Sequence, residues 1–232
     1  MEFRIRPRKL ALSLMACAVL LVIAHVGGAI MSHVFHHPRV YGLIATFDLN
    51  VENNVPTFFA TFILVACALL LSIIASQPSV TPKAGYWKWL AIIFLFLAVD
   101  EDASLHELLI QPVGDTLQVT GLLYFAWIIP YGLAVLIIGL LYLRFVWSLP
   151  VHTRRLFIAA GSLYIGGALG VESLGGWYFS QHGEEEDLAY SLLVAVEESL
   201  EMAGVILFIY ALLDFLRDQL AGAPLRISIL TR

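Results

Sequence analysis

Charge is scarce in this 232-residue sequence: Asp, Glu, Lys and Arg make up 13% of it, whereas hydrophobic residues make up 60%. Residues 10–38, 53–82 and 116–143 contain no charged residue, and each run exceeds the ~20 residues that cross a bilayer as a helix. These runs exclude a soluble domain and a disordered chain. The net charge of −5 and the lack of a Lys/Arg-rich segment beyond residue 9 exclude a basic nucleic-acid-binding protein.

Cysteine is also scarce. The two cysteines, Cys17 and Cys67, each lie inside an apolar run, so neither a disulfide framework nor a cysteine metal site is expected. The sequence contains no internal repeat of fixed period, which argues against a solenoid and against a transporter built from inverted repeats.

Apolar length and boundary residues predict an all-α, polytopic transmembrane helix bundle that forms a single domain over residues 1–232. The first apolar segment is too long for the core of a signal peptide and lacks a small-residue cleavage pattern, so we expect it to remain as an anchor. The six predicted spans are about 10–31, 56–76, 87–110, 119–147, 155–180 and 188–216.

The distribution of Lys and Arg predicts the orientation of these spans. An even number of spans places both termini on one side. On that side the N-terminus, the 77–88 and 144–155 loops and the C-terminal tail hold twelve of the thirteen basic residues, and only Arg39 lies opposite. Because Lys and Arg favour cytoplasmic loops, both termini are predicted to be cytoplasmic.

Small residues in the fifth span predict a close helix contact. Gly166 and Gly170 are separated by three residues, and this spacing places both on one helix face that lets another helix approach closely. Plain helix packing explains such a face, and a partner helix from another protein is the alternative.

Acidic residues fall mainly on the side opposite the basic ones. The run of residues 184–187 is expected to be a solvated loop. Asp100, however, lies about 18 Å along its helix from Lys88, and Glu197 and Glu201 lie about 15–21 Å inward from the start of their helix. These acids are therefore predicted at membrane depth, without a basic partner.

The third span ends in a polar motif from Asp100 to Glu107. If the helix continues through it, Asp100, Ser104 and Glu107 share one face, and Asp102 and His106 pair at positions i and i+4.

Crowded acids at this depth are expected to bind protons or cations, because an ionised carboxylate near the bilayer centre costs at least ~2.5–3.5 kcal/mol. Imidazole with carboxylates suits Fe, Mn or Zn better than Ca or Mg. We therefore predict a site for one or two divalent transition-metal ions, with a proton-only network as the alternative. The predicted ligands are Asp100, Glu101, His106, Glu107, Glu197, Glu198 and Glu201, and Glu172 is the predicted catalytic proton relay or a carboxylate that supports the ligands.

Three further features have open roles. His25, inside the first span, is expected to be a packed or hydrogen-bonded histidine rather than a ligand. Glu52 either caps the second span, where the helix dipole favours an acid, or forms a carboxylate lid over the acids. The His36–His37 pair is placed to load a metal from the periplasm.

Three motifs carry a resemblance: Phe47 to Thr57 reads FDLxxExNxPT, Asp100 to Glu107 reads DExxxxHE, and Glu197 to Met202 reads EExxEM. In this order they resemble an uncharacterised family of bacterial polytopic membrane proteins. The resemblance implies that the protein lies in the inner (cytoplasmic) membrane of a bacterium, with the acids facing the periplasm. The resemblance covers most of the chain from the second span to the sixth and implies no activity. The sequence lacks the repeated His boxes of membrane desaturases and the second His of a zinc protease.

Three functions remain open at this point. The first is a metal-dependent membrane oxidoreductase or hydrolase acting on a lipid, a quinone or oxygen from the periplasmic side. The second is a cation transporter or proton-coupled carrier, which would need polar access from both sides. The third is a structural subunit of a membrane complex, which would explain the glycine face but not the acids.

The basic-residue asymmetry leads to a test of orientation. A reporter fused after Arg232 is expected to be active in the cytoplasm, whereas a reporter placed in the 184–187 loop is expected to be periplasmic. A periplasmic C-terminal fusion would contradict the orientation and, with it, the side assigned to every acid.

Overall fold

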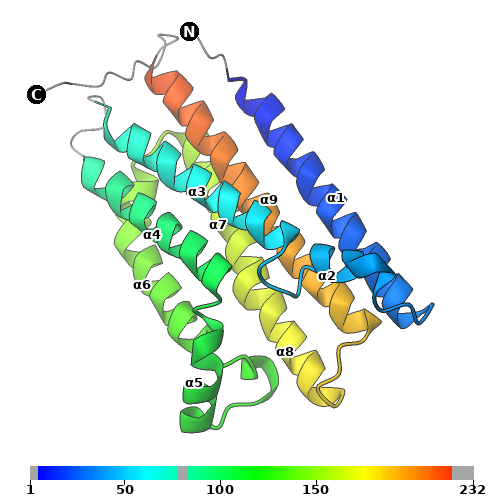
Figure 1. Ribbon diagram of the computed structural model, residues 1–232. Helices are drawn as coiled ribbons and strands as arrows, with labels where there is room; N and C mark the ends of the chain where they lie inside the picture. The colour runs from blue at the N-terminus through cyan, green and yellow to red at the C-terminus, as the bar shows by residue number, and fades with distance from the viewer. Residues whose placement is uncertain (1–4, 78–82, 221–232) are drawn as a thin grey trace, which may run out of the picture.

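The computed structural model describes residues 5–77 and 83–220, and all regular elements in these two ranges are helical. The long helices run side by side in one bundle (Figure 1). They are α1 (Pro7–His33), α3 (Val55–Ala75), α4 (Ala84–Ala103), α6 (Ile128–Trp147), α7 (Val151–Ile165), α8 (Glu172–Gln181) and α9 (Leu188–Gln219). The shorter ones are α2 (Leu43–Phe47), α5 (Ile110–Leu117), 3-10 helices at Val40–Gly42, Glu107–Leu109 and Gly121–Leu123, and a π-helix at Gly166–Val171.

Five helical rods are long and apolar enough to cross a membrane: α1, α3, α6, the continuous rod of α7, π-helix and α8, and α9. Helix α4 is not among them, because Lys88 and the three acids from Asp100 to Asp102 lie within its 20 residues. The all-helical fold and several membrane-spanning helices are thus confirmed. The sixth span and the orientation stay predictions.

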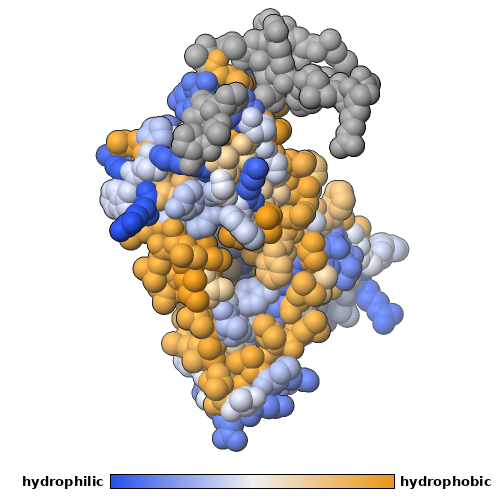
Figure 2. Space-filling view, turned by 90° about the vertical axis from the view of Figure 1, so that its left-hand side faces the viewer, coloured by the Kyte–Doolittle hydropathy of each residue, from blue (hydrophilic) through white to orange (hydrophobic). Residues whose placement is uncertain are grey.

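The two ends of the bundle differ in content. Helix α1 begins and α9 ends at one end, and the opposite end holds α2, α5 and the connection from α8 to α9 (Figure 1). A broad apolar belt lies between hydrophilic ends, with a hydrophilic area inside the belt on one face (Figure 2). Three of the basic residues behind the predicted orientation, Arg4, Arg226 and Arg232, lie outside the described residues.

Helix α9 is the centre of the bundle and packs against α1, α3 and α7. The half of α9 from Met202 to Leu216 is mostly buried and apolar. Around it, the Trp87 ring stacks on Phe215 at 5.0 Å and meets Phe145 edge-on at 5.1 Å. This apolar core fills the end of the bundle where α9 ends, so the acids of α9 lie in the other half.

Two glycines let the rod formed by α7 and the π-helix touch α9 through the backbone. A Cβ atom on Gly167 would lie 2.7 Å from the Glu197 carbonyl oxygen, and one on Gly204 would lie 2.7 Å from the Tyr164 nitrogen. A Cβ on Gly166 or Gly170 would meet no described atom within 4 Å. The close approach within the chain therefore uses Gly167, and the predicted Gly166/Gly170 face is left uncovered by the described helices.

These contacts predict opposite effects of the same substitution. Gly204→Ala and Gly167→Ala are each expected to lower the free energy of unfolding by about 1–3 kcal/mol, because backbone atoms must move apart. Gly166→Ala and Gly170→Ala are the matched controls and are expected to be neutral or slightly stabilising, since Ala favours helix over Gly. Thermal unfolding in detergent measures all four, and an equal response would contradict the assignment.

Candidate functional site

Helix α4 ends earlier than the predicted third span, which was expected to continue to residue 110. Helix α4 ends at Ala103 because Ser104 takes up a left-handed conformation, with φ 46° and ψ 42°. The backbone then forms short helical turns and reaches α6 only at Ile128. The span boundaries expected at 110 and 119 therefore fall inside an irregular segment, residues 104–127, at the end of the bundle.

Asp100 organises this segment. Its side chain is 9% exposed, and its Oδ1 accepts hydrogen bonds from the His106 backbone N–H at 2.9 Å and from the Tyr131 hydroxyl at 2.9 Å. The His106 Nδ1 lies 3.4 Å from Asp100 Oδ2. Because the helix stops at Ala103, the pairing of Asp102 with His106 expected for a continuous helix does not form, and Asp102 is exposed.

A second group of polar contacts lies beside His106. The imidazole packs against the Trp127 ring, with centroids 4.7 Å apart. The indole Nε1–H of Trp127 donates to Glu172 Oε1 at 3.3 Å, and Glu172 and Glu197 are neighbouring carboxyl residues that interact with each other. A bond between two carboxyl groups requires a proton on one of them. The site thus contains a carboxyl pair suited to share a proton.

A small cavity brings together three further predicted site residues. Glu101 of α4 and Glu198 and Glu201 of α9 line it, together with Tyr164 of α7. The cavity has a volume of about 10 Å³, which is close to the minimum that holds one bound water. We call these three groups together the polar site; its members are Asp100, His106 and Tyr131, then Trp127, Glu172 and Glu197, and finally Glu101, Tyr164, Glu198 and Glu201.

Glu52 borders the polar site instead of capping a helix. The residue before α3 is Asn54, whose side chain accepts a hydrogen bond from the Thr57 N–H at 3.2 Å. Glu52 interacts electrostatically with Glu101 and Glu198, and its Oε2 is buried without a hydrogen-bond partner among the described residues. The capping interpretation of Glu52 is therefore wrong, and its position fits the lid interpretation.

The polar site lacks a preassembled metal centre. Within residues 5–77 and 83–220, no three His, Cys, Asp or Glu side chains are arranged to hold a metal ion. Glu107 is exposed to solvent, and His36 and His37 are exposed on the loop after α1. The ligand roles assigned to the seven residues from Asp100 to Glu201 therefore stay predictions.

His25 is a buried, hydrogen-bonded histidine, as expected. Its side chain is 4% exposed, its Nε2 lies 3.0 Å from the Ser191 carbonyl oxygen, and its Nδ1 lies 3.0 Å from the Leu49 backbone nitrogen. The same Nδ1 is 3.1 Å from Asp48 Oδ1. His25 thereby joins α1 and α9 to the loop that precedes α3.

The loop of residues 184–187 is only partly solvated. Glu184 and Glu185 are exposed, but Asp187 caps α9 by accepting a hydrogen bond from the Tyr190 N–H at 2.8 Å. Tyr178 also donates its hydroxyl to Asp187 at 2.7 Å. The expectation that the whole run is solvated is therefore wrong for Asp187.

Trp127, Tyr131 and Gly167 also belong to the polar site, and none of them was predicted from the sequence. An indole and a phenol inside a charge-free run are also typical of an interfacial aromatic belt, so their types alone do not indicate a site. Gly167 lies between the two glycines that the spacing rule selected. Only its contact with Glu197 and Glu201 distinguishes it.

Two acids on the loop before α3 have opposite pKa shifts. Burial raises the pKa of Glu52, and the negative charge of Glu107 raises it further. Burial also opposes ionisation of Asp48, but hydrogen bonds from His25 and the Asn50 N–H outweigh it and lower the pKa of Asp48. Glu52 thus favours the protonated form and Asp48 the ionised form.

Comparison with known proteins gives a family without an activity. The chain belongs to the family described as a domain of unknown function (DUF8692), whose model matches residues 6–216. No curated protein and no solved structure matches the chain.

The two pKa shifts predict opposite pH dependences. The contribution of Glu52 to stability falls as the pH rises from the ordinary pKa of its carboxyl group, 4.5, through its higher folded pKa. Glu52→Gln is therefore expected to stabilise the metal-free protein at pH 8 and to have little effect at pH 4. Asp48 contributes stability above its unfolded pKa and loses it as pH falls through the lower folded pKa. Asp48→Asn is therefore expected to destabilise at pH 8.

Thermal unfolding at several pH values, with a chelator present, measures both effects. If Glu52→Gln lowers the melting temperature at pH 8 under these conditions, the carboxyl of Glu52 is stabilised by a partner and is not an uncompensated buried acid.

Proposed function

We propose that this protein is a membrane enzyme of the bacterial inner membrane whose polar site transfers protons to and from a substrate that enters from the periplasmic side. The carboxyl pair of Glu172 and Glu197 carries this proposal. Two neighbouring carboxyl groups cannot both ionise easily, so one holds a proton while the other accepts one. Such a pair supplies an acid and a base in one place.

The surroundings of the pair support catalysis by Glu172. Trp127 fixes one carboxyl oxygen of Glu172 through its N–H. Glu172 follows directly on the π-helix Gly166–Val171, and π-helical turns occur frequently at functional sites. Among the described residues, no Lys or Arg forms an ion pair with an acid of the polar site. The pair therefore has no permanent cation that would keep both carboxyls ionised.

The distribution of polar groups favours an enzyme over a carrier. The polar site lies in the first half of α9, whereas the second half, from Met202 to Leu216, is mostly buried and apolar. Its buried acid, Asp214, is bound to Arg217 at 2.7 Å. A carrier needs polar access from both sides, and an enzyme that meets its substrate from one side does not. A lipid, a quinone or oxygen reaches such a site from the membrane or the periplasm, in a hydrolytic or an oxidoreductive reaction.

A bound divalent transition metal, Fe, Mn or Zn, is the second part of the proposal. The buried Oε2 of Glu52 has no described hydrogen-bond partner, and the cavity beside Glu101, Glu198 and Glu201 is small. A cation there would pair with that oxygen and with the three carboxylates, after small side-chain movements. His106 already has Asp100 as its partner, so its role as a ligand requires it to leave that contact.

Two other functions remain as alternatives. A proton-coupled or cation carrier would use the same carboxyls and would open the apolar half of the bundle during transport. A structural subunit would bind a partner helix at the Gly166/Gly170 face, which the described helices leave uncovered.

The proposal predicts protonated carboxyl groups at neutral pH. Infrared spectra of the protein in lipid bilayers are expected to contain the band of protonated carboxylic acid at pH 7, and Glu197→Gln is expected to remove part of it. Glu185→Gln, at an exposed loop acid, is the control and is expected to leave the band unchanged. A spectrum without this band at pH 7 would contradict the proton-sharing pair.

Metal analysis of the same preparations tests the second part. Stoichiometric Fe, Mn or Zn that is lost in Glu201→Gln, but retained in Glu185→Gln, would support a metal-dependent enzyme. Negligible metal in all preparations, together with unchanged thermal stability on adding these ions, would reject the metal while leaving the carboxyl pair intact.

A further inference from the structure

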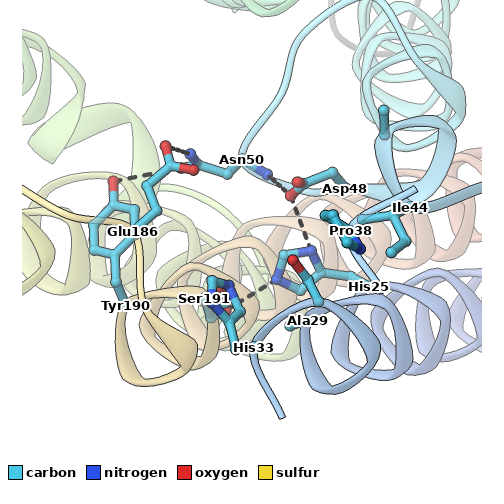
Figure 3. A pocket seen from close by; sticks show the side chains of 12 residues that line it. His25, Ala29, His33, Pro38, Ile44, Asp48, Asn50, Glu186, Tyr190 and Ser191 are labelled. Carbon is cyan, nitrogen blue, oxygen red and sulfur yellow. Dashed lines mark hydrogen bonds and ion pairs between the residues drawn. The ribbon is translucent and has the colours of Figure 1, made fainter. Parts of the chain in front are cut away.

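A second and larger cavity lies away from the polar site, at the end of the bundle that holds α2. It measures about 240 Å³, is open to the surface, and is lined by α1, the segment between α1 and α3, the α8–α9 connection and the start of α9. Figure 3 shows its polar side chains, Asp48, Asn50, Glu186 and Tyr190, along one wall. Asp48 and Asn50 come from the loop before α3, Glu186 comes from the α8–α9 connection, and Tyr190 comes from the first turn of α9.

The hydrogen bonds of this wall leave two carboxylate oxygens free. Asn50 donates from its side chain to Glu186 Oε1 at 2.9 Å and from its backbone to Asp48 Oδ1 at 3.0 Å. Tyr190 donates to Asn50 Oδ1 at 3.4 Å, and His25 also lies on Asp48 Oδ1. No described residue donates to Asp48 Oδ2 or Glu186 Oε2. The hydrogen bonds of the wall therefore use one oxygen of each carboxylate, and the other oxygen of each carboxylate is free to accept a hydrogen bond.

The charge of the wall is negative. Hydrogen bonds to Asp48 lower its pKa despite its burial, so it is ionised at neutral pH. Among the described residues, neither Asp48 nor Glu186 forms an ion pair with Lys or Arg. His25 contacts Asp48, and His33 also borders the cavity. A ligand that complements this wall carries positive charge and donates hydrogen bonds.

The size of the cavity and the apolar part of its lining favour an organic cation as the ligand. A volume of about 240 Å³ is several times the ~30 Å³ that a water molecule occupies in the liquid, and is thus far larger than a bare metal ion needs. Ala29, Pro38 and Ile44 supply apolar surface on other sides of the cavity. A short alkyl or hydroxyalkyl group attached to the charged centre would cover this surface.

We propose that this pocket binds the ammonium group of a small amine, with the carboxylates of Asp48 and Glu186 as its charge partners. The ammonium donates hydrogen bonds to the free carboxylate oxygens, and the carbon atoms of the amine pack against Ala29 and Ile44. The amine is either a free molecule on the loop side of the membrane or the headgroup of an aminophospholipid, since both present the same ammonium group. This site is independent of the proposed catalytic chemistry.

Binding of ethanolamine to the purified protein, measured by calorimetry in detergent, tests the free-amine source. Ethylene glycol, which lacks the charge, is the control ligand. Glu186→Gln keeps an oxygen for Asn50 but removes the charge, and it is expected to weaken binding about tenfold. Glu185→Gln, one residue away and outside the pocket, is expected to bind as the native protein does.

The lipid source is tested with nanodiscs of phosphatidylglycerol alone or mixed with phosphatidylethanolamine. An increase in melting temperature that depends on phosphatidylethanolamine, and that Glu186→Gln removes but Glu185→Gln does not, assigns the ammonium to the lipid. The proposal is overturned if neither ethanolamine nor phosphatidylethanolamine has an effect, if ethylene glycol binds as well as ethanolamine, or if both variants respond equally. Circular dichroism of each variant confirms that it is folded.

Discussion

Gly167 and Gly204 hold the backbones of the α7 rod and α9 closer together than a Cβ atom at either position would allow. Glu197 and Glu201 lie directly on Gly167, so this contact sets how far their side chains reach into the bundle. The π-helix at Gly166–Val171 lies at the same level. A π-helical turn holds more residues than an α-helical turn, so it shifts the register of the residues that follow. Glu172, the first residue after it, is a neighbour of Glu197.

A second constraint acts from the other side of the polar site. Asp100 binds the backbone of His106 and the hydroxyl of Tyr131, and it thereby fixes the turn that replaces the last part of the expected span. Trp127, held near His106 by this turn, then reaches Glu172. The irregular segment of residues 104–127 thereby links Asp100 of α4 to Glu172 of α8.

The helices were predictable and their local departures were not. Apolar length identifies membrane helices because backbone polar groups in lipid must be satisfied within the segment. No residue type in the sequence Asp-Ala-Ser-Leu-His predicts that Ser104 turns left-handed, since a hydroxyl residue has no strong preference for that conformation. The choice of Gly166 and Gly170 assumed an α-helical period, and the π-helix changes that period where the contact occurs. The acids of the candidate site could be selected from the sequence because their depth without basic partners is independent of these details.

The loop before α3 joins the outer cavity to the polar site. Asp48 lies on His25 and borders the outer cavity, whereas Glu52, four residues later, borders the polar site. Four residues of extended chain span at most about 14 Å, and Asn54 anchors the loop to the start of α3. The distance between Asp48 and Glu52 is therefore bounded by the length of this loop. A single segment of backbone places one carboxylate at the outer cavity and another at the polar site.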